Sequence, residues 1–159
     1  MGNKIYFEDC RRGETVVTPE RTITNEDILV FANLTGDRSS VHLDEAFART
    51  TPFGGRIAHG LLMLSIGSGL FLQAAPNSAF PESMIALYSM SKVRFLRATH
   101  IGDTVHVETE VIDLLELDAQ RGLIVARHWI VNQDKEKVVA FRTKALVGRR
   151  PPSGENSGE

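Results

Sequence analysis

The sequence predicts a single α+β domain in which one long apolar helix packs against an antiparallel sheet that curls around it. The chain of 159 residues has the length of one domain. Residues 60–73 form an apolar run of helical length, and the second half of the chain alternates apolar with polar residues, as strands do. Because a helix that is apolar on nearly every side is expected to be buried, the sheet must surround it.

The part of the chain before this helix predicts short elements. Residues 15–18 read as an extended piece ended by proline. Thr24 caps a helix, with an acidic residue three positions later, and Gly36 ends that helix. We expect a loop over residues 37–42, and then one or two helical turns over residues 44–49 that begin at an acidic cap.

The second half predicts strands that follow one another without intervening helices, so the sheet should be antiparallel. The predicted strands lie near residues 93–97, 105–111, 123–131 and 139–147, with turns at residues 101–103 and 132–135. The domain is expected to occupy residues 1–148. Residues 149–159 have no apolar side chain except proline and predict a flexible tail.

Composition excludes several classes of function. A formal net charge of −2, from 18 basic and 20 acidic residues, argues against nucleic acid as a partner. The single cysteine, Cys10, excludes an internal disulfide and any cysteine-cluster metal site. The apolar run is too short and too polar to span a membrane, and the N-terminal residues lack a signal-peptide core, so a cytoplasmic protein is expected.

Two segments contain candidate catalytic residues. Residues 36–44 place Asp37 and His42 five positions apart on a loop after a helix. Residues 53–60 place Gly60 at the start of the apolar helix, where backbone N–H groups are free and the end of the helix dipole is positive. Together they predict an acid–base pair that faces a site able to polarise a carbonyl group.

At these residues the chain resembles the MaoC-like dehydratases and (R)-specific enoyl-CoA hydratases, which have the hot-dog fold. The family motif Gly-Asp-x-Asn-Pro-x-His-x-Asp stands at residues 36–44 as Gly-Asp-Arg-Ser-Ser-Val-His-Leu-Asp. The motif Phe-Gly-x-x-Ile-x-His-Gly-x-Leu stands at residues 53–62. The resemblance covers about residues 5–148. One departure is that the usual Asn-Pro is Ser39-Ser40 here, which removes the rigidity of proline.

The resemblance implies a reversible hydration of a 2-enoyl-CoA to an (R)-3-hydroxyacyl-CoA. Asp37 and His42 would be the catalytic pair, and the backbone N–H of Gly60 would stabilise the thioester oxygen. No metal and no cofactor is expected beyond the coenzyme A of the substrate. The resemblance also implies a homodimer or higher homo-oligomer with a continuous sheet, with the site near the subunit interface.

Three further residues are assigned to substrate binding, and each also has a structural interpretation. Ser39 stands where the family has asparagine. Ser68 matches a family serine on the central helix, but it is also a small residue suited to helix packing. His59 precedes the helix, and its ring is expected to hydrogen-bond the turn before that helix.

Other interpretations are open. A hot-dog thioesterase, an acyl-carrier-protein dehydratase and a non-catalytic acyl-CoA-binding subunit would use a similar pocket. Metal ligation by His42, Asp44 and Glu45 is disfavoured because nothing fixes a geometry. Arg56 is a candidate for the phosphates of coenzyme A, although a packing role is favoured. The sequence assigns no role to His100, His106 and His128.

Overall fold

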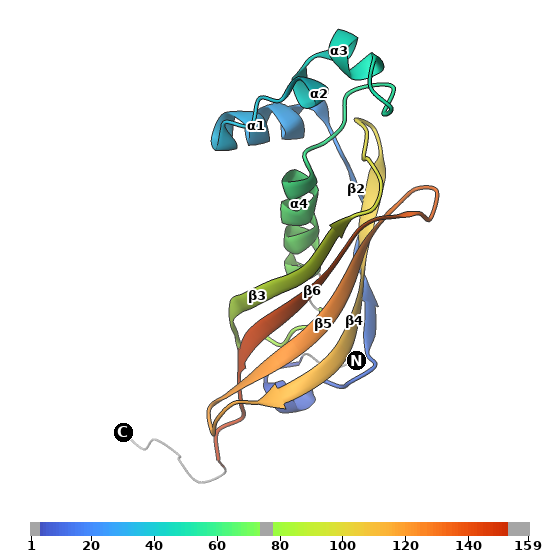
Figure 1. Ribbon diagram of the computed structural model, residues 1–159. Coiled ribbons are helices and arrows are strands. Elements are labelled where there is room, and N and C mark those ends of the chain that lie inside the picture. Colours follow the sequence, from blue (N-terminus) through green and yellow to red (C-terminus); the bar gives the residue numbers. More distant parts are fainter. Residues whose placement is uncertain (1–3, 74–77, 153–159) are drawn as a thin grey trace.

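The computed structural model describes residues 4–73 and 78–152 of the chain. Its elements follow in an order that separates the helices from the long strands (Figure 1). They are η1 (Phe7–Asp9), β1 (Thr15–Val17), β2 (Arg21–Thr22), α1 (Asn25–Thr35), α2 (Ser40–Leu43), α3 (Glu45–Arg49), α4 (Gly60–Gln73), β3 (Met84–Phe95), β4 (Thr104–Glu116), β5 (Arg121–Asn132) and β6 (Lys137–Gly148).

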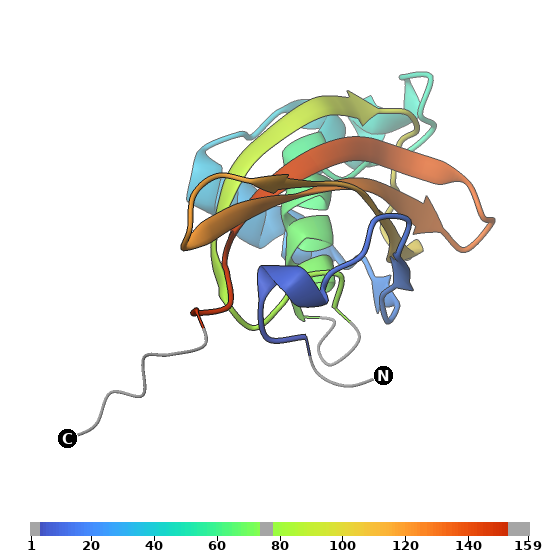
Figure 2. The same cartoon turned by 90° about the horizontal axis from the view of Figure 1, so that it is seen from below.

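The strands form one antiparallel sheet that curves around α4, which confirms the predicted α+β layout (Figures 1 and 2). The strand order is β1-β4-β5-β6-β3, and β2 pairs with β4 beside β1. The predicted strand at residues 93–97 is only the end of β3, which begins at Met84. Register shifts along its pairing with β6 break the alternation that would have revealed the whole strand.

The core lies between α4 and the concave face of the sheet. Leu62, Met63, Ile66 and Phe71 of α4 are buried there. The helix approaches the sheet so closely at Gly67 that a Cβ atom there would lie 2.6 Å from Cδ1 of Ile130 in β5. A side chain at this position would push the helix off the sheet, so the close packing depends on glycine.

The prediction that this helix is buried on every side is wrong for the single chain. Leu61 is 61% exposed, and Leu72 is also exposed. The physical reason is that the curved sheet covers one face of α4 and leaves part of the other face open. Within the described residues, no helix combines the length and apolarity that a membrane span requires.

The two caps predicted for α1 are confirmed. The Thr24 hydroxyl accepts a hydrogen bond from the Asp27 N–H, and Gly36 ends the helix in the left-handed conformation. The loop predicted over residues 37–42 is partly helical, because α2 makes one turn from Ser40. Asp44 caps α3 with its side chain, as the acidic cap predicted.

The segment after β6 begins with two arginines that are held in place. Arg149 forms ion pairs with Glu8 and Glu116, and Arg150 pairs with Asp9. The first residues of the predicted tail therefore contact η1 and the end of β4. Residues 153–159, on which the rest of that prediction falls, lie outside the described residues.

His128 of β5 is fully buried in the core, which the sequence did not indicate. Its Nδ1 lies 2.9 Å from the Thr109 hydroxyl, and its Nε2 lies 2.8 Å from the Thr143 hydroxyl. Its ring stacks against Phe71 and against Phe141, at centroid distances of 4.4 and 4.7 Å. Burial lowers the pKa of His128 to about 3, so the ring is neutral in the folded protein at ordinary pH.

Because of His128, the free energy of unfolding is expected to decrease as the pH is lowered. The unfolded chain binds a proton at this histidine near pH 6.5, whereas the folded chain, with a pKa of about 3, does not. Between pH 7 and pH 5 the unfolded state therefore gains about 2 kcal/mol from this group. His128→Gln keeps hydrogen-bonding atoms but cannot titrate. Urea unfolding at both pH values should show about 2 kcal/mol less loss for this variant than for the wild type.

His106→Gln is the matched control, since His106 is a partly exposed histidine on the neighbouring strand. It should keep the wild-type loss of stability. An equal loss of unfolding free energy in the wild type and in His128→Gln would show that His128 does not cause the pH dependence.

Candidate active site

A cavity of about 420 Å³ lies at the N-terminal end of α4. Its wall is built by α1, the segment from Asp37 to His42, the start of α4 and the end of β3. The lining is mostly apolar, with a few polar groups at one side, as in many small-molecule sites. The apolar side chains are Phe31, Phe53, Ile57, Leu61, Met63, Phe95, Leu96 and Val139, and the polar ones are Asp37, His42, His59, Arg97 and Thr99.

Asp37 follows Gly36 and is fixed by Ser39. The Ser39 hydroxyl donates to Asp37 Oδ1 at 2.6 Å, and the Ser39 N–H donates to the same oxygen at 3.2 Å. These two hydrogen bonds, and then the nearby rings of His59 and His42, hold the pKa of Asp37 below its usual value. Asp37 is therefore a carboxylate at neutral pH, and Ser39 acts as its positioning residue.

His42 lies in α2, and its tautomer follows from a single contact. Its Nδ1 is 2.8 Å from the Ile57 carbonyl oxygen. A carbonyl oxygen only accepts hydrogen bonds, so Nδ1 carries the proton. In the neutral ring Nε2 then bears the lone pair, which can accept a proton or a hydrogen bond.

His59 is 2% exposed and precedes α4. The prediction that its ring bonds the turn before the helix is wrong, because its Nε2 donates to the Asp37 carbonyl oxygen at 3.0 Å. That bond is possible because the ring stacks on the ring of His42, with centroids 3.8 Å apart, and so reaches the Asp37 loop. His59 Nδ1 is buried and has no hydrogen-bond partner among the described residues.

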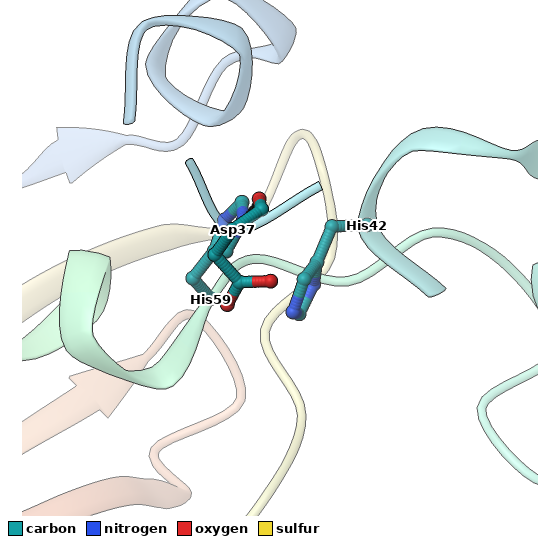
Figure 3. A group of neighbouring side chains, drawn as sticks. All are labelled: Asp37, His42 and His59. Atoms are coloured by element: carbon teal, nitrogen blue, oxygen red, sulfur yellow. Dashed lines mark hydrogen bonds between the residues drawn. The ribbon is translucent and has the colours of Figure 1, made fainter. Parts of the chain in front are cut away.

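The two motifs identified in the sequence meet in space, as predicted. One ligand atom from each of Asp37, His42 and His59 lies within 4.8 Å of the other two. Figure 3 shows the three side chains converging on one small volume. This places a carboxylate and two imidazole rings together in an otherwise mostly apolar cavity.

Gly60 is the first residue of α4 and lines the cavity. Its N–H has no hydrogen-bond partner among the described residues, as is usual for a helix start. A Cβ atom at this position would lie 2.8 Å from the Phe95 ring. Any larger residue here would therefore require the Phe95 ring to move, so glycine allows Phe95 to pack against the start of α4.

Ser68 is not brought into this cavity. Its hydroxyl donates to the Leu64 carbonyl oxygen at 3.0 Å, within α4 itself. Eight residues separate it from Gly60, which is about 12 Å along a helix axis. The packing interpretation of Ser68 fits the described chain better than contact with a ligand at this site.

Arg56 has the structural role that the sequence favoured. Its Nε donates to the His42 carbonyl oxygen at 2.6 Å, and its Nη2 donates to Asn25 Oδ1 at 2.9 Å. It therefore ties α2 to the start of α1. Sequence reasoning did not single out Phe31, Phe95 or Arg97 as cavity residues, because they come from distant elements that only the fold brings together.

A curved antiparallel sheet wrapped around one helix is the hot-dog fold. A Mycobacterium tuberculosis protein described as having a double hot-dog fold matches this fold, with a TM-score of 0.79 at 23% identity over 93% of this chain and 45% of that one. The family model described as MaoC like domain matches residues 9–132. The chain belongs to this family.

Named relatives agree with this assignment. An (R)-specific enoyl-CoA hydratase from Rhodospirillum rubrum is 37% identical over 89% of this chain and 81% of that protein. The structure of a monoamine oxidase regulatory protein from Archaeoglobus fulgius has a TM-score of 0.87 at 37% identity, over 94% of this chain and 98% of that one. The chain spans 29% of the Klebsiella aerogenes protein MaoC and 66% of a Methylorubrum extorquens 3-hydroxybutyryl-CoA dehydratase.

Restoring the family's proline at position 40 should stabilise the protein. Ser40 is the first residue of α2, where proline loses no helical hydrogen bond, and Ser39 has the extended backbone that precedes proline readily (φ −55°, ψ 135°). Ser40→Pro should raise the free energy of unfolding by about 0.4–1 kcal/mol, because it restricts the unfolded chain. Ser40→Ala removes the hydroxyl without fixing φ and is the control. A lower free energy of unfolding for Ser40→Pro than for Ser40→Ala, measured by urea unfolding, would contradict this prediction.

Proposed function

We propose that this protein is a hydratase/dehydratase, a carbon–oxygen lyase that interconverts a 2-enoyl-CoA and an (R)-3-hydroxyacyl-CoA. The observation that carries the proposal is that the ionised Asp37 lies close to His42, whose Nδ1 is held by the Ile57 carbonyl oxygen so that Nε2 is left for the reaction. Relatives named (R)-specific enoyl-CoA hydratase and 3-hydroxybutyryl-CoA dehydratase support the same reaction class.

The spacing of the pair suits one water molecule. Two acceptors that share a water lie about 4.4 Å apart, given hydrogen bonds near 2.8 Å. The ligand atoms of Asp37 and His42 lie no more than 4.8 Å apart. In the proposed step, the Asp37 carboxylate and the neutral form of His42 both begin without a proton at the atom that reacts. The proton that the pair takes from water as oxygen attacks Cβ is therefore the proton that it gives to Cα, and the reaction balances without another acid.

The start of α4 would stabilise the charge that develops during this step. Attack at Cβ moves negative charge to the thioester oxygen, and the Gly60 N–H at the positive end of the helix dipole can donate to that oxygen. The apolar wall of the cavity, including Phe31, Met63 and Phe95, would hold the acyl chain. In this scheme the only cofactor is the coenzyme A carried by the substrate.

The hydratase proposal is tested with purified protein and crotonyl-CoA, by following the loss of enoyl absorbance. Asp37→Asn removes the charge, and His42→Ala removes the lone pair. Each should reduce kcat/KM by roughly 10²–10⁴-fold, the usual contribution of a positioned acid–base group. Both variants should keep the wild-type circular dichroism spectrum, because neither side chain belongs to the core.

His106→Gln is the control and should keep wild-type activity, since His106 does not line the cavity. Full activity in both site variants would refute the assignment of the pair. Release of free thiol from acyl-CoA would favour a thioesterase, and activity on acyl-carrier-protein substrates alone would favour the corresponding dehydratase. Binding of acyl-CoA without turnover would indicate a non-catalytic subunit.

We also propose that two copies pair through β3 to form a homodimer with a continuous sheet. β3 is an edge strand, and it exposes Ile85, Leu87 and Tyr88. A long edge strand with exposed apolar side chains favours pairing with another strand. The same association would cover part of the open face of α4.

Sedimentation equilibrium should give at least twice the chain mass of 17.6 kDa. The double variant Ile85→Lys/Tyr88→Lys should be monomeric, because a two-fold axis brings like charges of the two copies together. Val17→Lys is the matched control, as Val17 has the same 63% exposure as Tyr88 but lies in β1 near the opposite edge. A monomeric wild type, or a dimer disrupted by Val17→Lys instead, would contradict pairing through β3.

A further inference from the structure

We infer that Met63 sets an upper limit on the acyl chain that the cavity accepts, and that the substrate is therefore a short-chain acyl thioester. The inference rests on the proposed function for the direction in which the substrate lies. It goes beyond that function, because hydration of an enoyl-CoA requires no particular chain length. Three features support it, namely the burial of the lining residues, the short distance from Gly60 to Met63, and the packing beyond Met63.

The burial of the lining residues distinguishes a mouth of the cavity from an inner end. Phe53, Leu61 and Phe95 line the cavity and are exposed, so they belong to the mouth. Met63 and Val139 also line it, but they are only 2% and 1% exposed and belong to the hydrophobic core. A ligand that enters from solvent therefore passes the exposed side chains first and meets Met63 and Val139 last.

The proposed reaction fixes where the reacting end of the substrate lies. The thioester oxygen would lie at the Gly60 N–H, and Cβ would lie beside Asp37 and His42. Coenzyme A is too large for the cavity and must extend through the mouth, so only the carbons beyond Cβ extend toward the inner end. Met63 follows Gly60 by three residues on the same face of α4, which is about 4.5 Å along the helix axis. This distance leaves room for only a few carbon atoms beyond Cβ.

The space beyond Met63 is closed by close packing between α4 and the sheet. Within the described residues, the part of α4 that lines the cavity ends at Met63. Four residues later Gly67 lies so close to Ile130 of β5 that a Cβ atom would be 2.6 Å from Cδ1 of that side chain. After one more turn, Phe71 stacks against His128. A longer acyl chain would therefore have to displace Met63 and then separate the helix from the sheet, which a closely packed core resists.

The limit is tested by measuring kcat/KM for crotonyl-CoA, 2-octenoyl-CoA and 2-dodecenoyl-CoA. The wild type should be at least roughly tenfold less active on the octenoyl than on the crotonyl substrate, since one excess methylene group alone can produce such discrimination in an apolar pocket. Met63→Ala opens space at the inner end and should raise the octenoyl-to-crotonyl ratio of kcat/KM by roughly tenfold or more. The dodecenoyl substrate should remain poor, because Gly67 and Ile130 still close the way beyond.

Met90→Ala is the matched control. Met90 is a methionine of β3 that packs against the same core but does not line the cavity, so its truncation should leave the ratio unchanged. Val139→Ala shortens the inner end from the side of the sheet and should raise the ratio as Met63→Ala does. It keeps the test decisive where circular dichroism shows that Met63→Ala does not fold.

Three results would overturn the inference. The first is a wild type with equal kcat/KM for 2-dodecenoyl-CoA and crotonyl-CoA. The second is an unchanged octenoyl-to-crotonyl ratio in the folded variants among Met63→Ala and Val139→Ala. The third is an equal rise of that ratio in Met90→Ala, because loosening of the core in general would then explain the change.

Binding of saturated acyl-CoA separates this inference from the proposed function. Butyryl-CoA and octanoyl-CoA cannot be hydrated, and isothermal titration calorimetry gives their dissociation constants. The wild type should bind butyryl-CoA at least tenfold more tightly, and Met63→Ala should remove this preference. The same preference in a protein that does not hydrate crotonyl-CoA would support the limit at Met63 and refute the proposed function. Octanoyl-CoA bound as tightly as butyryl-CoA, or no binding of either, would refute the limit, and hydration of crotonyl-CoA would still support the proposed function.

Discussion

The site depends on a reciprocal pair of hydrogen bonds between imidazole rings and backbone carbonyls. His42, from the first motif, donates to the carbonyl oxygen of Ile57 in the second motif. His59, from the second motif, donates to the carbonyl oxygen of Asp37 in the first. Each motif therefore holds the backbone of the other. The same two bonds select which ring nitrogen carries the proton in each neutral imidazole, so one constraint sets both the geometry of the loops and the tautomers.

The second motif is itself held by the connection between β3 and β4. The Ala58 N–H donates to the Thr99 carbonyl oxygen at 2.8 Å, and Ile57 forms an isolated β-bridge with His100. The chain enters α4 two residues after Ala58, so this connection helps to orient the start of the helix and the free N–H of Gly60. Catalytic groups on loops thus take their precision from the regular elements on either side.

Local sequence patterns predicted the ends of helices well, but they could not predict contacts between segments that are far apart in the sequence. Thr24 and Gly36 mark the ends of α1 because caps are satisfied within a few residues. The pairing of Asp37 with His42 was predicted from their spacing on one segment and from the family motif that this segment resembles. The partner of His59 and the burial of His128 were missed, since they depend on ring packing across elements far apart in the sequence.

The incorrect prediction that α4 is buried on every side is the most informative one. Its sequence is apolar all round, and that pattern indicates burial on all sides. In the single chain, however, Leu61 and Leu72 remain exposed beyond the reach of the sheet. A sequence adapts to the surroundings in which the chain works, so an apolar residue that one chain leaves in water argues for a surface that another chain covers. The homodimer proposed above would cover this open face of α4 together with the apolar edge of β3, while Leu61 also lines the cavity at the start of the helix.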